Sequence, residues 1–348
     1  MKYILGIEST AHTFGVAVLD FDGKILSNVR DMYTTKEGGM IPIEVRKHHA
    51  EVSDKLFREA LSEACVDEED LAVIAFSNAP GLAPCLLEGM KFAKENAKTL
   101  DVPLVMVNHC VAHLEIGSSI GAHHGRTPKH SPEECLQGAK DPVMLYASGA
   151  NTQIIAYEAE KYRVFGETLD LGVGNFIDTI ARYMGLGFPG GPKIQKLAEG
   201  CKDKSRLIDL PYSIKGMDVA FSGLQTKIKT LIDKKTYTNE ELAYSMQEVV
   251  FAMLVEAAER ALAHTGKKEF LLGGGVGCNS RLQEMCKIMC KERGVKFFCP
   301  DRSLLVDNAG MIGYLGLKMF KAGLGTKNLD EVDIAPRERT DEVVVTWR

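Results

Sequence analysis

The sequence predicts an α/β protein with a duplicated fold, in which two lobes enclose a cleft for a nucleotide and a metal. The 348 residues exceed what one hydrophobic core usually supports, so two lobes are expected. Each half contains three β-prone runs followed by alternating strands and helices, which is typical of duplicated nucleotide-binding folds. His109 and His113 have the spacing of metal ligands on one face of a helix.

The first half begins with three β-prone runs, at residues 3–9, 14–19 and 24–33. Apolar residues spaced among charged ones predict an amphipathic helix over residues 43–64. Residues 71–76 are almost all apolar, as in a strand buried within a parallel sheet. This half is completed by a helix ending near Leu100, a strand at 103–107 and a helix from about Asn108.

The second half repeats the plan. Strands are expected at residues 143–147, 152–157 and 162–167, followed by a loop and a helix from Gly172. The pattern then predicts a buried strand at 269–272, a helix from Asn279, a strand at 296–299 and a helix from Asn308. Residues 224–232 are rich in lysine and predict a helix that interrupts this half.

These patterns divide the chain into four parts. We expect an N-terminal lobe at residues 1–120, with the helix 308–325 packing back on it. Residues 121–140 show little periodicity and predict a surface insertion. The C-terminal lobe is expected at 141–325, with a helical insertion at about 200–240, and residues 326–348 form a tail.

Composition indicates an ordinary globular protein, with 45% hydrophobic and 26% charged residues. The net charge of −5 argues against a surface devoted entirely to nucleic acid, although a local basic patch remains compatible. The nine cysteines are odd in number and scattered, which favours a reduced compartment without disulfides. The first apolar run is too short for a signal peptide or a membrane span, so a cytoplasmic protein is expected.

His109 and His113 lie four residues apart, so on a helix both imidazoles face the same side and can share a metal. The alternative is that the two histidines hydrogen-bond neighbouring polar groups and bind no metal. In the metalloprotease motif H-E-x-x-H a general-base glutamate follows the first histidine, whereas here Cys110 follows it, which disfavours hydrolysis. Asp307 is the best third ligand, with a helix N-cap as its compatible alternative role.

Two glycine turns, at residues 148–152 and 273–279, follow strands and can bring backbone N–H groups to phosphate oxygens. Neither is a P-loop. Asp178 and residues 190–192 are further candidates for ribose and phosphate contacts, with a solvated helix face as the alternative for Asp178. Glu8, close to His12 at the end of the first strand, is a candidate contact to the reacting group, with a surface hairpin as its alternative.

Nine segments together carry a resemblance to a known family: residues 6–15, 107–115, 145–153, 167–175, 188–192, 215–223, 274–282, 307–312 and 336–343. Nearly end to end, the chain resembles the tRNA-modifying member of the ASKHA superfamily of actin-like ATPases. This member is the catalytic subunit of the KEOPS complex of archaea and eukaryotes, which is related to bacterial TsaD. The tail and Asn151 resemble the archaeal and eukaryal forms.

The resemblance implies a duplicated actin-like fold and a tRNA adenosine threonylcarbamoyltransferase. Such an enzyme moves the threonylcarbamoyl group from threonylcarbamoyl-AMP to the exocyclic amine of the adenosine beside the anticodon, in tRNAs that read codons beginning with A. Its implied partners are tRNA, a small protein kinase/ATPase, a dimerising small subunit and a tRNA-tail-binding subunit. ATP is a further nucleotide that the site would bind.

The resemblance also implies a set of site residues. One divalent metal, iron or zinc, would act as a Lewis acid. Its ligands would be His109, His113 and Asp307, with Tyr146 as a fourth. Glu8 and His12 are the implied catalytic residues. The adenylate site would be lined by Tyr146, Ala147, Ser148, Gly149, Ala150, Asp178, Gly191, Gln195 and Asn279.

The chain departs from the family pattern at several positions. Asn78-Ala79 replaces a further Gly-Pro-like pair, Leu87 stands where an arginine is expected, and Gln195 replaces a glutamate. Leu87 supplies no charge, and Gln195 can hydrogen-bond a ribose hydroxyl only as an amide. These departures leave one alternative open, a divergent nucleotide-binding paralogue that acts as a scaffold subunit without transferase activity.

Overall fold

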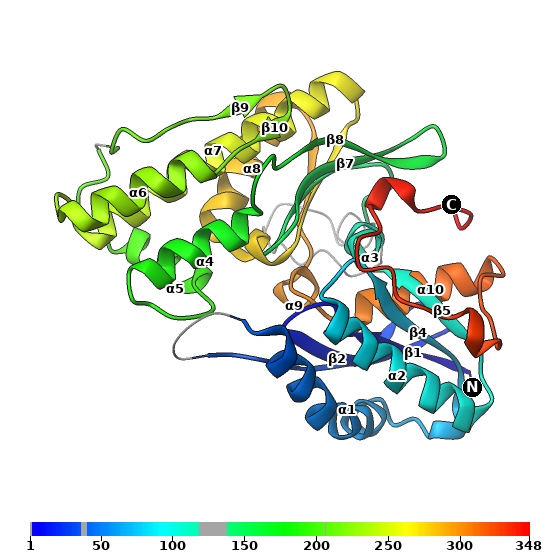
Figure 1. Cartoon of the computed structure of the whole chain (residues 1–348). Helices are drawn as coiled ribbons and strands as arrows, with labels where there is room; N and C mark the ends of the chain where they lie inside the picture. Colours follow the sequence, from blue (N-terminus) through cyan, green and yellow to red (C-terminus); the bar gives the residue numbers. More distant parts are fainter. Residues whose placement is uncertain (1, 36–39, 118–137, 206) are drawn as a thin grey trace.

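The computed structural model describes residues 2–35, 40–117, 138–205 and 207–348. Two sheets form the centres of two lobes, and Figure 1 shows the short helix α3 (His109–Ile116) between them. Most of the surface insertion expected at residues 121–140 lies outside the described residues.

The first lobe contains a five-stranded sheet in the order β3-β2-β1-β4-β5. Its strands are β1 (Tyr3–Glu8), β2 (Thr13–Asp20), β3 (Ile25–Met32), β4 (Leu71–Ala79) and β5 (Leu104–Asn108). The first three form an antiparallel meander, and β4 and β5 continue the sheet parallel to β1. The three expected runs and both crossover strands are therefore confirmed.

The second lobe repeats this topology in a sheet of order β12-β11-β6-β7-β8. Its strands are β6 (Val143–Ala147), β7 (Thr152–Glu158), β8 (Lys161–Glu167), β11 (Glu269–Gly273) and β12 (Lys296–Phe298). Again a meander of three antiparallel strands extends through two parallel ones. Because both sheets have the same order and the same strand directions, the predicted duplication is confirmed.

Helices cover both sheets. On the first sheet α1 (Pro42–Ala64) and α2 (Ala83–Leu100) pack on one face, and α3 and α10 (Ala309–Lys321) on the other. Successive side chains of β2 point to opposite faces of the sheet, so both faces are covered by helices. Val16 and Val18 face α1 and α2, while Ala17 and Leu19 face α10. The second lobe contains α4 (Val173–Tyr183), α5 (Gly191–Glu199), α6 (Ser222–Lys234), α7 (Asn239–Thr265), α8 (Ser280–Arg293) and α9 (Arg302–Leu305). Small strands β9 (Ile214–Lys215) and β10 (Asp218–Val219) pair with each other.

The long helix α7 was not predicted. Much of its surface is buried in the core of the second lobe, so its sequence lacks the single apolar stripe by which amphipathic helices are recognised. The capping box formed by Thr238 and Glu241 is the signal that would have marked its start. In the part of the chain that the structure describes, neither α7 nor any other helix is both long and apolar enough to cross a membrane.

Helix α10 approaches the first sheet closely at Gly6. A Cβ at Gly6 would lie 2.3 Å from the carbonyl oxygen of Ala309 and 2.7 Å from the amide nitrogen of Gly313. Both atoms belong to the backbone and cannot rotate away. We expect Gly6→Ala to lower the free energy of unfolding by about 2–3 kcal/mol in chemical denaturation.

Gly223→Ala is the matched control for this prediction. Gly223 lies in α6, and a Cβ there would meet nothing within 4 Å. This change should raise stability by up to about 1 kcal/mol, because alanine loses less backbone entropy on folding. Equal stability of the two variants would contradict the close approach of α10 to β1.

A buried carboxylate lies near the end of α3. Glu115 is 0% exposed and accepts hydrogen bonds from Tyr162 in β8 and Lys318 in α10. Burial by itself raises the pKa of this carboxyl, but the charges of Arg348 and Lys318 outweigh it and hold the pKa at about 2. Glu115 is therefore ionised and links α3 to both lobes.

This depressed pKa makes stability depend on pH. The ordinary glutamate pKa is about 4.3, so the Glu115 carboxylate contributes fully above that pH, and its contribution disappears as pH falls toward 2. A shift of this size corresponds to about 3 kcal/mol. Urea unfolding at several pH values should show the free energy of unfolding falling more steeply for the natural protein than for Glu115→Gln in this window. If the free energy of unfolding fell equally steeply with pH in both proteins, Glu115 would not contribute in this way.

Candidate metal and nucleotide site

Helix α3 carries two histidines on one face. Strand β5 ends at Asn108, whose side-chain oxygen accepts hydrogen bonds from the backbone N–H groups of Cys110 and Val111 at 3.0 and 3.2 Å. This N-cap begins the helix at the first histidine. The rings of His109 and His113 lie 4.8 Å apart between centroids, and both are buried.

Asp307 reaches the histidines from the loop between α9 and α10. Its Oδ1 lies 3.4 Å from Nε2 of His109 and 3.6 Å from Nε2 of His113. The alternative role of Asp307 as the N-cap of α10 is wrong, because Asn308 is the cap and accepts a hydrogen bond from the Met311 N–H at 3.0 Å. Asp307 is therefore free of the helix and faces the two rings.

These three side chains fit a metal. The ligand atoms of His109, His113 and Asp307 all lie within 4.8 Å of one another. Nε2 of His113 is buried and has no hydrogen-bond partner among the described residues, which is costly unless a ligand occupies it. Burial also lowers the pKa of His113, so its ring is neutral at pH 7 and offers a lone pair. Imidazole and carboxylate donors suit iron and zinc alike.

Glu8 orients His109. Its Oε2 lies 2.9 Å from Nδ1 of His109, and its Oε1 accepts hydrogen bonds from the N–H and the hydroxyl of Thr10 at 2.8 and 2.5 Å. Glu8 is 0% exposed, so the alternative of a surface hairpin is wrong. A carboxylate on Nδ1 favours the ring proton there, which leaves the lone pair of Nε2 free to bind a metal on the side of Asp307. Glu8 thus contacts the histidine and does not line the adjoining cavity.

A cavity of about 600 Å³ adjoins these residues, a volume typical of small-molecule sites. It is lined by His12, Met32 and Asp307 on the side of the first lobe and by residues of both glycine turns and of α4, α5 and α7 in the second. Nδ1 of His12 lies 3.9 Å from Oδ2 of Asp307, which places His12 at the metal end of the cavity.

The glycine turns meet at this cavity. Gly274 has a φ of +85°, and a Cβ on it would lie 2.4 Å from the carbonyl oxygen of Ala147, so the two turns touch backbone to backbone. Ser148 and Gly149 line the cavity, whereas Ala147 is buried behind them and Ala150 is not among the lining residues. Tyr146 lies on β6, with its ring centroid 5.1 Å from that of His113. Burial raises the pKa of Tyr146, which keeps its hydroxyl neutral.

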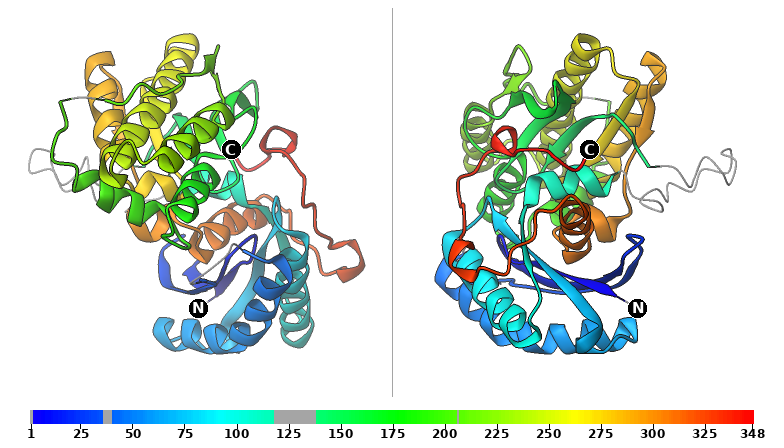
Figure 2. Two further views of the ribbon diagram at one scale, coloured as in Figure 1. Left: turned by 60° about the vertical axis from the view of Figure 1, so that its left-hand side comes forward. Right: turned by 90° about the vertical axis from the view of Figure 1, so that its right-hand side faces the viewer.

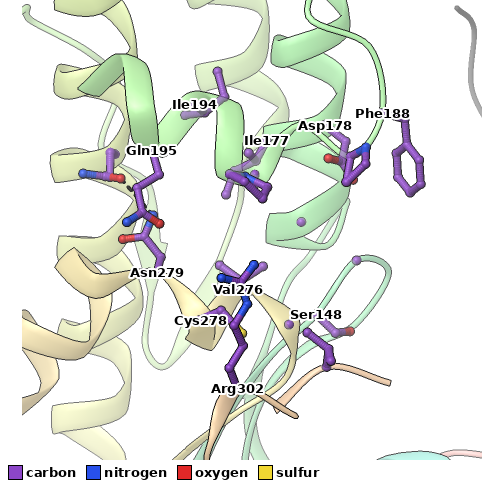
Figure 3. Close-up of a pocket in the computed structure, with 18 of the residues that line it drawn as sticks. Ser148, Ile177, Asp178, Phe188, Ile194, Gln195, Val276, Cys278, Asn279 and Arg302 are labelled. Atoms are coloured by element: carbon purple, nitrogen blue, oxygen red, sulfur yellow. Dashed lines mark hydrogen bonds between the residues drawn. The ribbon is translucent and has the colours of Figure 1, made fainter. Parts of the chain in front are cut away.

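Predicted polar residues of α4, of α5 and of the N-cap of α8 also line the cavity. Figure 3 shows Gln195 and Asn279 on one side of it and Asp178 on the other. The Gln195 amide donates to Ser280 Oγ at 3.0 Å, and the Asn279 amide donates to Gln247 at 2.9 Å. Asp178 accepts the Gly190 N–H at 2.7 Å, so it holds the loop before α5 and is not on a solvated helix face. Gly191, next to it, also lines the cavity.

An apolar wall completes the cavity, and the sequence did not predict it. Its side chains are Ile177, Ile194, Val276, Met246, Val250 and Phe251. The last three belong to α7, so they were missed together with that helix. An apolar wall beside a few polar groups is suited to a flat heteroaromatic ring.

The departures from the family pattern lie outside this cavity, except for Gln195. Leu87 is 44% exposed on α2 and is not among the residues that line the cavity. Asn78 binds the tail, since its carbonyl oxygen accepts the Ala335 N–H at 2.9 Å.

The chain belongs to the class of proteins with the duplicated actin-like fold. The structure of full-length HypF, in a phosphate- and nucleotide-bound form, superposes with a TM-score of 0.57 at 13% identity, covering 91% of this chain and 46% of that one. A second neighbour is the activator of 2-hydroxyisocaproyl-CoA dehydratase from Clostridium difficile with bound ADPNP. It superposes with a TM-score of 0.52 at 10% identity, covering 96% and 99% of the two chains.

The sequence places the chain more narrowly within that class. The family model TsaD, described as tRNA N6-adenosine threonylcarbamoyltransferase, matches residues 24–314. Proteins of that name from Thermococcus sibiricus and Thermococcus kodakarensis are 49% and 48% identical to this chain, over 99% of each sequence. A probable bifunctional tRNA threonylcarbamoyladenosine biosynthesis protein from Methanosarcina acetivorans is 47% identical over 99% of this chain and 59% of its own. The chain belongs to the TsaD family of tRNA N6-adenosine threonylcarbamoyltransferases.

Proposed function

We propose that this enzyme transfers the threonylcarbamoyl group from threonylcarbamoyl-AMP to the exocyclic amine of the adenosine beside the anticodon of tRNAs that read A-starting codons. One observation carries the proposal: His109, His113 and Asp307 lie together at one end of a cavity large enough for an adenylate. Family membership names the reaction, and the site provides the chemistry that an acyl-adenylate needs.

Each part of the cavity has a role in this proposal. The apolar wall with Ile177, Ile194 and Val276 receives the adenine ring, and Gln195 and Asn279 lie near the ribose. The first glycine turn, at Ser148 and Gly149, lines the part of the cavity that would receive the phosphate. This arrangement directs the carbamoyl end of the adenylate toward His12 and Asp307.

His109, His113 and Asp307 would hold one divalent metal, iron or zinc, with Tyr146 as the candidate fourth ligand. When bound, this metal supplies Lewis-acid stabilisation of the negative charge on the adenylate. Glu8 keeps Nε2 of His109 available as a ligand. Glu8 is therefore proposed as a positioning residue.

The reaction exchanges one bond for another. The adenosine nitrogen forms a bond to the carbamoyl carbon, the bond from that carbon to the phosphate oxygen breaks, and AMP leaves. The attacking amine loses one proton in this step. We assign the acceptance of that proton to His12, because its imidazole lines the cavity beside the metal ligands.

The wider assembly belongs to the same proposal. Beside tRNA, the partners are the KEOPS subunits: a small protein kinase/ATPase, a dimerising small subunit and a tRNA-tail-binding subunit. The cytoplasm is the proposed location, and the eight cysteines among the described residues are free thiols. We propose lobe boundaries at residues 1–120 and 141–325, and the packing of α10 on β1, β2 and β4 supports its assignment to the first lobe.

The test is reconstitution. The purified chain, substrate tRNA and threonylcarbamoyl-AMP are incubated with the partner subunits, and modified adenosine is measured by mass spectrometry of the digested tRNA. We expect modified adenosine together with equimolar AMP. Bound nucleotide without any modified adenosine would overturn the transferase proposal and favour the scaffold alternative.

A further inference from the structure

The chain after α10 crosses from the first lobe to the second. Figure 2 shows this red segment running along one edge of the molecule between the lobes. At the first lobe it is held by two backbone hydrogen bonds: the Ala335 N–H donates to Asn78 at 2.9 Å, and the Gly81 N–H donates to Pro336 at 3.2 Å. At the second lobe Thr340 donates to Gln153 at 3.3 Å. We call residues 335–348 the strap.

The strap contacts the first turn of α3. The side-chain amide of Asn108 donates to Oε2 of Glu338 at 2.8 Å. The same Asn108 uses its oxygen to cap α3. Glu338 therefore fixes the orientation of the cap from which His109 follows directly.

The strap returns to α3 at its other end. The Trp347 indole and the Arg348 guanidinium each donate to Oε1 of Glu115, both at 3.0 Å. The guanidinium also lies over the rings of Tyr157 and Tyr162, 4.8 and 5.3 Å from their centroids. Both ends of the helix that carries His109 and His113 are thus held by one segment of chain.

We propose that the strap is a positioning device for α3, with Glu338 and Arg348 as its two anchor residues. Helix α3 has 8 residues, and an isolated helix of that length is not stable in water, so its geometry depends on tertiary contacts. Holding both ends limits the fraying and sliding that would separate the two imidazoles from Asp307. The link to metal binding rests on the metal site proposed above.

Hydrogen–deuterium exchange of the metal-free protein tests the strap directly. In Arg348→Ala and in Glu338→Ala, the backbone amides of α3 should exchange at least about tenfold faster than in the natural protein. Arg348→Ala leaves Glu115 paired with Lys318 and Tyr162, so no buried charge is left alone. Amides of β1 and α7 should keep their exchange rates, which separates loosening of α3 from general unfolding.

Arg337→Ala is the matched control, because Arg337 lies in the same strap, is exposed, and forms no hydrogen bond or ion pair with another described residue. It should leave exchange at α3 unchanged. The dissociation constant for zinc, measured by competition with a chelator, should rise about tenfold in Arg348→Ala and return toward the natural value in Arg348→Lys.

One result would overturn the strap and another would overturn the metal site, and the two results are distinguishable. Unchanged exchange at α3 in both anchor variants would overturn the strap. A natural protein that binds no zinc or iron would overturn the metal site and leave the strap standing, because exchange is measured without metal.

Discussion

Replacing His113 with alanine is expected to remove the metal and to lower the rate of threonylcarbamoyl transfer about a thousandfold or more. The ring provides Nε2 to the site, and that atom has no other partner among the described residues, so no hydrogen bond is lost with it. Lewis-acid stabilisation amounts to several kcal/mol, and each 1.36 kcal/mol is a factor of ten in rate. Metal content of anaerobically purified protein and single-turnover transfer rates measure the two effects.

His264→Ala is the control, because His264 is an exposed histidine of α7 away from the site. It should retain metal and activity. Thermal unfolding of both variants checks that the fold persists, since removal of a buried ring leaves a cavity that costs a few kcal/mol. Full metal content in His113→Ala would contradict the assignment of this residue as a ligand.

Glu8→Gln is expected to weaken metal binding about 10- to 100-fold without removing a ligand. The carboxylate accepts from Thr10 on one oxygen and from His109 on the other. An amide has one acceptor oxygen, so either the Thr10 N–H loses its partner or the amide group donates to Nδ1 of His109. In the second case the ring proton moves to Nε2 and blocks the ligand atom.

Glu44→Gln controls for the general effect of losing one carboxylate from this lobe. Glu44 is partly exposed on α1 and, among the residues that the structure describes, its side chain pairs only with Lys47. Its substitution should change neither the zinc dissociation constant nor transfer activity. If Glu8→Gln bound zinc as tightly as the natural protein, Glu8 would not orient His109.

Local patterns predicted most of the sheet framework. The predicted strand runs end within about three residues of the observed ones, because alternation and short apolar runs reflect burial on a sheet directly. The helices expected from Asn108, Asn279 and Asn308 begin within one residue of those positions, and in the structure each asparagine caps its helix. The duplication followed from two similar orders of elements.

The sequence predicted less about residues whose roles depend on partners distant in the chain. The histidine spacing indicated two ligands, but the sequence also allowed Asp307 to be the N-cap of α10, a role that Asn308 has in the structure. Glu8 was expected at the reacting group, whereas its carboxylate lies behind His109. The apolar wall from α7 and the contacts between the strap and α3 were not predicted from the sequence.

The sequence by itself determined the strands of the two five-stranded sheets, most of the helices, the repeated topology and the pair of histidines, because each of these depends on residues close together in the chain. Only the tertiary structure decided which side chains meet. Asp307 reaches histidines nearly two hundred residues earlier, and Arg348 reaches Glu115 across 233 residues. Contacts at such separation depend on how the two sheets pack around α3, and packing leaves no periodic trace in the sequence.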